Sequence, residues 1–172
     1  MENKIFIKVV FLGESEVGKT SLIDRYISGD FYDHPTSTAN YSSKKINCDG
    51  KEYTFDIWDT SGYEKYRALT KYFIIDAHII VLVYDISRKK TFLELDFWLD
   101  TVLKVLGPNI SLILVGNKSD LYINEEISED DAKKFAKIIK AKFTLASPKE
   151  DYHTWNTFFE NALIDYIKIN KL

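Results

Sequence analysis

A chain of 172 residues, of which 45% are hydrophobic and 28% charged, has the composition of one globular domain that can bury a sizeable core. Its net charge of −3 gives no reason to expect a general affinity for nucleic acid. A single cysteine excludes an internal disulfide and a zinc site built from several cysteines. No apolar run reaches the roughly 18 residues that a membrane-spanning helix needs.

Strands and helices are expected to alternate along the chain. The strands are predicted at residues 5–12, 41–48, 51–59, 78–85, 111–117 and 142–145. The helices are predicted at residues 19–28, 64–72, 89–106, 128–139 and 152–168. The dipeptide Asp49-Gly50 predicts a hairpin between the second and third strands. The pattern therefore predicts a single α/β domain over residues 1–172: a three-layer fold whose six-stranded, mostly parallel sheet has one antiparallel strand and helices on both faces.

Residues 13–20 read GESEVGKT, which matches the phosphate-binding pattern G-x-x-x-x-G-K-[ST] between a predicted strand and a predicted helix. Two glycines let the backbone turn sharply, and successive N–H groups at a helix N-terminus form an anion-binding nest. Lys19 is expected on the β- and γ-phosphates, and the Thr20 hydroxyl on Mg²⁺. The residues expected to bind the nucleotide here are Ser15, Glu16, Val17, Gly18, Lys19, Thr20 and Ser21. The alternative, a glycine turn before an ordinary helix, does not explain the matched context.

Two further stretches follow predicted strands, at the sheet edge where ligands of such folds bind. In residues 59–62, Asp59 is expected to hold the Mg²⁺ shell through water, and Gly62 to offer an N–H to a γ-phosphate. In residues 117–120, the Asp120 carboxylate matches the N1–H and amino donors of guanine, which adenine lacks. The Lys118 stem is expected to cover the base. The alternative interpretation is a plain turn for residues 59–62 and a surface loop for residues 117–120.

These motifs resemble those of the Ras-superfamily small GTPases, most closely the Rab branch. The resemblance covers residues 7–167 and rests on GESEVGKT, WDTSG at 58–62, VYDIS at 83–87, VGNKSD at 115–120 and a degenerate ASPK at 146–149. It implies a P-loop G domain that binds GTP and GDP with Mg²⁺, hydrolyses GTP and switches at residues 33–42 and 60–72. It also implies base contacts from Phe31, Asn117, Ser147, Pro148 and Lys149.

Three residues depart from the family pattern. Tyr63 stands where the family usually has the glutamine that orients the attacking water, so slow hydrolysis is expected. Glu16 places a carboxylate in the phosphate loop, which is unfavourable unless it points to solvent or pairs with a cation. Pro148 has no N–H to give to the guanine oxygen, so base selection would depend more strongly on Asp120.

The family's switch threonine, which binds Mg²⁺ and the γ-phosphate, has two candidates. Counting from Thr20 or Phe31 favours Thr38, whereas counting back from Asp59 favours Thr36. The hydrophobic residue and glycine that normally follow this threonine are missing after Thr38. Partner recognition is therefore expected to differ from that of ordinary Rab proteins.

The resemblance also implies partners: an exchange factor, an activating protein and effectors that contact the switch regions. Tyr41, Trp58 and Phe73 would form an effector-facing aromatic cluster, although simple packing is the alternative interpretation of these side chains.

No signal peptide is expected at the start of the chain, and a monomer is expected. The sequence carries no prenylation cysteine near Leu172, so membrane attachment would need a lipidated tail outside it. The expected location is cytoplasmic, with the cytosolic face of endomembranes as a site for a longer, lipidated form.

The function predicted from these features is a guanine-nucleotide switch that regulates membrane traffic. Two alternatives stay open at this stage. A non-catalytic interaction module is favoured by Tyr63, Glu16 and Pro148 and opposed by the intact motifs around them. Another P-loop phosphotransferase, such as a nucleoside monophosphate kinase, is disfavoured by residues 117–120 and by the lack of an arginine-rich lid.

Overall fold

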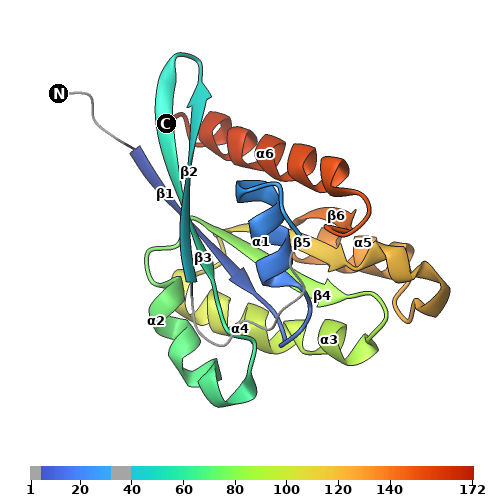
Figure 1. Ribbon diagram of the computed structural model, residues 1–172. Coiled ribbons are helices and arrows are strands. Elements are labelled where there is room, and N and C mark those ends of the chain that lie inside the picture. The colour runs from blue at the N-terminus through green and yellow to red at the C-terminus, as the bar shows by residue number, and fades with distance from the viewer. Residues whose placement is uncertain (1–4, 32–39) are drawn as a thin grey trace.

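The computed structural model describes residues 5–31 and 40–172, and its centre is a six-stranded sheet with the strand order β2-β3-β1-β4-β5-β6 (Figure 1). The strands are β1 (Ile5–Leu12), β2 (Asn40–Cys48), β3 (Lys51–Asp59), β4 (Ile79–Asp85), β5 (Ser111–Asn117) and β6 (Lys142–Ala146). Only β2 pairs in the antiparallel sense, with β3, and the other neighbours are parallel. The predicted fold class is confirmed, and each predicted strand lies within about one residue of an observed one.

Helices cover both faces of this sheet. They are α1 (Lys19–Ile27), α2 (Thr70–Ile74), α3 (Lys89–Leu93), α4 (Leu95–Leu106), α5 (Glu129–Ile138) and α6 (Tyr152–Ile169), with 3₁₀ helices η1 (Glu64–Leu69) and η2 (Ser119–Asn124). α1 and α6 lie on one face, whereas α2, α3 and α4 lie on the other (Figure 1). No helix within residues 5–31 and 40–172 is long and apolar enough to cross a membrane.

The alternation of side chains along β1 divides the core into two layers. Ile7, Val9 and Phe11 are fully buried toward α1 and α6, whereas Val10 and Leu12 are buried toward α2, α4 and α5. A strand that is apolar on both faces is expected in the middle of a sheet covered by helices on each side. This double burial fixes the carboxyl end of β1, and therefore the start of the phosphate loop.

The predicted hairpin turn is confirmed, and a side-chain cap marks the start of α5. Asp49 and Gly50 both have positive φ, 52° and 81°, as a tight hairpin turn with the right-handed twist of its strands requires. The Ser128 hydroxyl accepts a hydrogen bond from the Asp131 backbone N–H at 3.1 Å, and so caps α5.

Two helical predictions were wrong in detail, and one short helix was not predicted. The helix expected at 89–106 is divided at Glu94, whose ψ of −10° makes a 3₁₀-like turn between α3 and α4. The helix expected at 64–72 begins as η1 and becomes α-helical only at Thr70. The turn η2 was not expected; it begins because Lys118 adopts a left-handed φ of 62°, which redirects the chain after β5.

Candidate functional site

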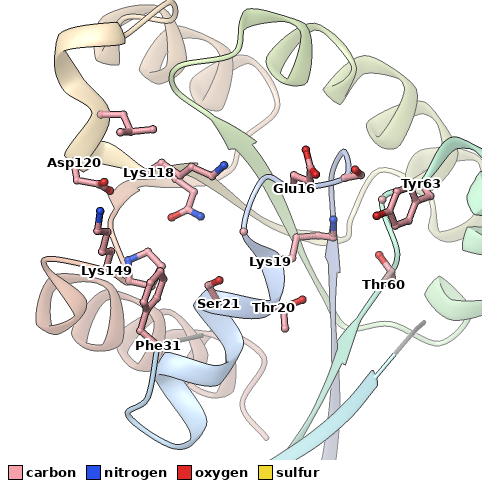
Figure 2. Close-up of a pocket in the computed structure, with 16 residues that line it drawn as sticks. Glu16, Lys19, Thr20, Ser21, Phe31, Thr60, Tyr63, Lys118, Asp120 and Lys149 are labelled. Atoms are coloured by element: carbon pink, nitrogen blue, oxygen red, sulfur yellow. The ribbon is translucent and has the colours of Figure 1, made fainter. Parts of the chain in front are cut away.

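A cleft of about 410 Å³ opens at the carboxyl ends of the central strands (Figure 2). Most of the residues predicted to bind the nucleotide line it: Ser15, Glu16, Gly18, Lys19, Thr20, Ser21, Phe31, Gly62, Tyr63, Asn117, Lys118, Asp120, Pro148 and Lys149. The predicted residues Val17, Asp59 and Ser147 are buried behind this lining. Thr60 and Leu121 line the cleft without having been predicted. Thr36 and Thr38 lie outside the residues that the structure describes.

The backbone of the phosphate loop approaches its neighbours too closely for side chains at two glycines. Gly13 has φ 147°, and a Cβ there would lie 2.2 Å from the Val83 carbonyl oxygen. Gly18 has φ 92°, and a Cβ there would lie 2.2 Å from Nδ2 of Asn117. A glycine at position 18 therefore lets the start of α1 pack directly against Asn117 of the predicted base-binding stretch.

Lys19 is buried at the bottom of the loop and points its ammonium back at the loop carbonyls. Its Nζ donates to the carbonyl oxygens of Gly13 at 2.9 Å and Glu14 at 2.8 Å. Burial lowers the pKa of Lys19 to about 8, and the charges of Asp59 and Glu14 only partly oppose that shift. A desolvated ammonium at the base of an N–H-rich loop is suited to an anionic ligand, which would stabilise its charge.

Thr20 and Asp59 place two oxygen atoms together at one edge of the cleft. The Thr20 hydroxyl donates a 2.5 Å hydrogen bond to Oδ2 of Asp59, although the two residues are 39 positions apart. The parallel pairing of β3 with β1, in which Asp59 lies opposite Phe11, brings the carboxylate to this position. A hydroxyl and a carboxylate are hard oxygen donors of the kind that Mg²⁺ prefers.

The other end of the cleft holds a carboxylate in a fixed orientation. Oδ1 of Asp120 accepts a 2.7 Å hydrogen bond from the Ser147 hydroxyl, which itself accepts one from the Glu150 N–H at 3.1 Å. Nδ2 of Asn117 donates to the Val17 carbonyl oxygen at 2.7 Å, which connects this end to the phosphate loop. Asp120 keeps acceptor capacity toward the cleft, because an ionised carboxylate has two oxygens with several lone pairs.

The loop after β6 is held by α1. Nε of Arg25 donates to the Pro148 carbonyl oxygen at 2.7 Å, and the Arg25 guanidinium lies 4.4 Å from the ring centre of Tyr152. Pro148 and Lys149 form the wall of the cleft beside Phe31. Since proline has no N–H, Pro148 contributes shape to this wall but no donor.

The structure answers the question raised by Glu16. Its carboxylate is 66% exposed and lies 3.7 Å from the Arg88 guanidinium, so it both points to solvent and pairs with a cation.

Tyr63 lines the phosphate end of the cleft and is 37% exposed. Figure 2 shows its hydroxyl turned toward the Lys19 side of the cleft.

Asp85 and Arg88 contact residues that line the cleft, and the sequence analysis did not identify either of them as a site residue. Asp85 ends β4 and is almost fully buried, with Lys118 Nζ 2.8 Å from its Oδ2. Burial alone would raise the pKa of Asp85, but hydrogen bonds from Lys118 and Ser87 hold that pKa below its usual range. The signal that would have found Asp85 is its place at the carboxyl end of a strand, the same signal that identified Asp59 and Asp120.

A second unexpected bridge fixes η1 against the phosphate loop. One nitrogen of Arg67 lies 2.5 Å from a carboxylate oxygen of Glu14 and 3.0 Å from one of Glu94. A Cβ on Gly62 would lie 2.2 Å from the Glu14 carbonyl carbon, so the segment before η1 also contacts the loop backbone directly. Any change in the position of this segment therefore breaks contacts with the loop.

The predicted aromatic cluster is present at the edge of the sheet. The rings of Tyr41 and Trp58 meet edge to face at 5.4 Å, and Trp58 lies 6.2 Å from Phe73. Tyr41 is 54% exposed, so the cluster has one open side.

Comparison with known proteins places these features in a family context. A sequence model of the Ras family matches residues 8–167. The chain is 39% identical over 163 residues to Ras-related protein Rab-21 of Bos taurus, covering 94% of this chain and 71% of the relative. It is 37% identical over 157 residues to Rab-21 of Geodia cydonium (90% and 69% covered) and 37% over 161 residues to Ras-related protein RABA1c of Arabidopsis thaliana (92% and 74% covered).

Proposed function

The chain belongs to the Ras family of small GTPases, close to its Rab branch, and from this premise we propose that it is a Mg²⁺-dependent GTP/GDP switch in membrane traffic. The observation that carries the proposal is one cleft with a phosphate loop at one end and the oriented carboxylate of Asp120 at the other. A guanine nucleotide matches both ends of this cleft, because it has an anionic polyphosphate for the loop and a base whose hydrogen-bond donors suit the Asp120 carboxylate.

The described residues fit both parts of this ligand. The buried Lys19 ammonium and the N–H groups before α1 would bind the phosphates, and Phe31, Lys118, Asp120 and Lys149 would surround the base. Thr20 would bind Mg²⁺ directly and Asp59 through water, which supports the choice of metal because both offer hard oxygens. When bound, Mg²⁺ neutralises negative charge on the phosphate oxygens.

The proposed reaction is hydrolysis of GTP by in-line attack of water on the γ-phosphate. Positioning and charge stabilisation supply most of the catalysis of phosphoryl transfer, and Lys19 with the loop N–H groups would stabilise charge on the transferred group. Tyr63 lines the cleft, and its side chain has no amide that could both donate a hydrogen bond to the attacking water and accept one from it. We therefore propose slow intrinsic turnover, with a partner able to supply the missing group.

The same residues define how the switch would work. Residues 60–72 contact the phosphate loop through Gly62 and Arg67, so loss of the γ-phosphate would change the fit of this segment. Exchange factors, an activating protein and effectors would contact the switch regions and the cluster of Tyr41, Trp58 and Phe73. We propose a cytoplasmic monomer, attached to the cytosolic face of endomembranes when a lipidated tail is present.

Mass spectrometry of the nucleotide released from purified protein tests the proposal directly. GDP or GTP is the expected species. An adenine nucleotide would contradict the role of Asp120, and protein without any nucleotide that also fails to take up GDP would favour the alternative of a nucleotide-free interaction module. Tyr63, Glu16 and Pro148 support a non-catalytic module, whereas the intact phosphate loop and residues 117–120 oppose a complete loss of nucleotide binding.

A further inference from the structure

Glu16 is an unusual residue for a loop that is proposed to bind phosphates. Its backbone is left-handed, with φ 63°, and its carboxylate lies on the rim of the cleft. A negative charge at this place opposes an anionic ligand, and the 66% exposure of the carboxylate screens that repulsion only in part. The loop therefore needs a cation close to Glu16 that does not itself leave with the ligand.

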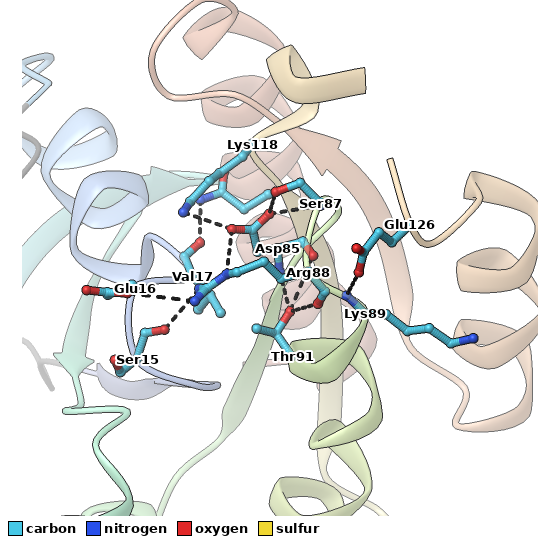
Figure 3. Close-up of polar contacts among 11 residues, drawn as sticks. Ser15, Glu16, Val17, Asp85, Ser87, Arg88, Lys89, Thr91, Lys118 and Glu126 are labelled. Atoms are coloured by element: carbon cyan, nitrogen blue, oxygen red, sulfur yellow. Dashed lines mark hydrogen bonds and ion pairs between the residues drawn. The ribbon is translucent and has the colours of Figure 1, made fainter. Parts of the chain in front are cut away.

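Arg88 is that cation, and it also connects two parts of the site. One terminal nitrogen lies 3.7 Å from the Glu16 carboxylate, and the other donates to the Ser15 carbonyl oxygen at 3.1 Å. On its opposite side, Nε lies 3.1 Å from Oδ2 of Asp85 at the end of β4 (Figure 3). A planar guanidinium with donors on several sides suits such a bridge, whereas a lysine could not make all three contacts.

Asp85 extends the bridge to the base-binding stretch. The same Oδ2 atom that contacts Arg88 also pairs with Lys118 Nζ at 2.8 Å. The other carboxylate oxygen accepts hydrogen bonds from the Ser87 N–H and hydroxyl, at 2.9 Å and 2.7 Å, which fix the carboxylate in place. Glu16, Arg88, Asp85 and Lys118 thus form an alternating chain of charges from the phosphate loop to the residue expected over the base (Figure 3).

We propose that Arg88 is a positioning residue that sets how long the nucleotide stays bound. It neutralises Glu16 and holds the phosphate loop against the base-binding stretch through Asp85. Loss of the Arg88 charge leaves Glu16 opposed to the phosphates and speeds nucleotide release. Removal of the Glu16 charge as well reverses most of that effect. The inference rests on the proposed nucleotide-binding function and names residues that control its kinetics.

The test is the release rate of a fluorescent GDP analogue, chased with excess unlabelled GDP. Arg88→Gln is expected to release the analogue roughly tenfold faster than the wild type, a change equivalent to about 1.4 kcal/mol. Glu16→Gln alone is expected to release it no faster than the wild type. The double variant is expected to lie within about threefold of the wild type, since the two side chains interact and their effects are not additive. Arg88→Lys, which keeps the charge but not the bridge, is expected in between.

Two further measurements separate this role from a general effect. Lys90→Gln removes one positive charge from the neighbouring exposed surface of α3 and is expected to leave the release rate unchanged. The thermal midpoint of each nucleotide-free variant reports whether Arg88 acts only on folding. A merely structural role would lower the midpoint of Arg88→Gln and give no relief from Glu16→Gln.

Release from Arg88→Gln at the wild-type rate, or a double variant as fast as Arg88→Gln, would overturn the inference. Failure of the underlying function is distinguishable, because a wild-type protein that takes up no labelled GDP gives no release signal at all. That result would remove the proposed function and, with it, this inference.

Discussion

The Ser147 hydroxyl donates a 2.7 Å hydrogen bond to Oδ1 of Asp120, so the loop after β6 orients the carboxylate that follows β5. The two residues are 27 positions apart, and parallel pairing of β5 with β6 brings the two loops together. A carboxylate held in this way loses little orientational freedom when it binds a base.

Asp120→Asn is expected to convert the base preference from guanine to xanthine. An amide can donate to the xanthine C2 carbonyl, whereas it loses the charge-assisted hydrogen bonds to guanine, which contribute about 1.5–3 kcal/mol. Competition of GDP, XDP and ADP for the same labelled ligand measures the change. Ser147→Ala is the matched control: it keeps the carboxylate, so GDP affinity should fall while guanine stays preferred. An Asp120→Asn protein with unchanged GDP preference would remove Asp120 from the base site.

Thr20→Asn is expected to weaken GTP binding more than GDP binding, by about tenfold or more in their ratio. The reason is that Thr20 and Asp59 are expected to hold the metal that contacts the terminal phosphates. Titrations of each nucleotide with Mg²⁺ and with EDTA report the difference. Equal affinities with and without metal, in both proteins, would contradict a magnesium site at this pair of oxygens.

The lowered pKa of Lys19, about 8, predicts how the stability of the nucleotide-free protein depends on pH. Between pH 8 and the ordinary lysine pKa of 10.5, the unfolded chain binds more protons at this residue than the folded protein, so this contribution to stability rises with pH. Its slope is at most about 1.4 kcal/mol per pH unit. Below pH 8 Lys19 is charged in both the folded and the unfolded protein. The cost of burying its charge is then fully present and does not change with pH.

Denaturant titrations of the wild type and of Lys19→Met measure this contribution. The variant should be more stable near pH 7, and its advantage should shrink from about pH 8 to pH 10.5, the range in which the folded lysine has lost its proton and the unfolded one has not. Saturating GDP should remove the effect, because phosphates stabilise the charged ammonium. A stability difference that does not vary over this range would show that Lys19 keeps an ordinary pKa.

Tyr63→Gln is expected to speed single-turnover hydrolysis of preloaded GTP. Restoring one group that positions the water should lower the barrier by about 1.4–3 kcal/mol, or roughly ten- to a hundredfold in rate. Phosphate release from the preloaded protein measures it. Tyr66→Gln is the matched control, because Tyr66 is a similarly exposed tyrosine three residues further along, and it should leave the rate unchanged. Brisk hydrolysis by the wild type, with no gain from glutamine, would show that another group positions the water.

The sequence predicted the sheet well because its signals are local. The apolar runs of β1, β4 and β5 and the turn at Asp49-Gly50 determine strands and a hairpin without reference to distant residues. The cleft was also predictable, because its residues follow strand ends and parallel strands end at one edge of the sheet.

The charge bridges could not be predicted in the same way. Arg88 and Arg67 meet Ser15 and Glu14 across 73 and 53 positions, so no local pattern marks these contacts. The division of the predicted helix at Glu94 was not predictable from the helical period either, and the Glu94 carboxylate pairs with Arg67 from another element. Short 3₁₀ helices such as η2 have no strong period of their own and depend on how the chain leaves a strand.

Equilibrium binding of GDP and ADP to the wild-type protein, with Mg²⁺ present, tests the central claim most directly. If the cleft binds a guanine nucleotide through the phosphate loop and Asp120, GDP should bind at least about a thousandfold more tightly than ADP, because adenine lacks the N1–H and amino donors that the Asp120 carboxylate would accept. Lys19→Met should weaken GDP binding in the same assay, since it removes the buried ammonium beneath the loop. Equal affinities for GDP and ADP, or no binding of either, would contradict the account.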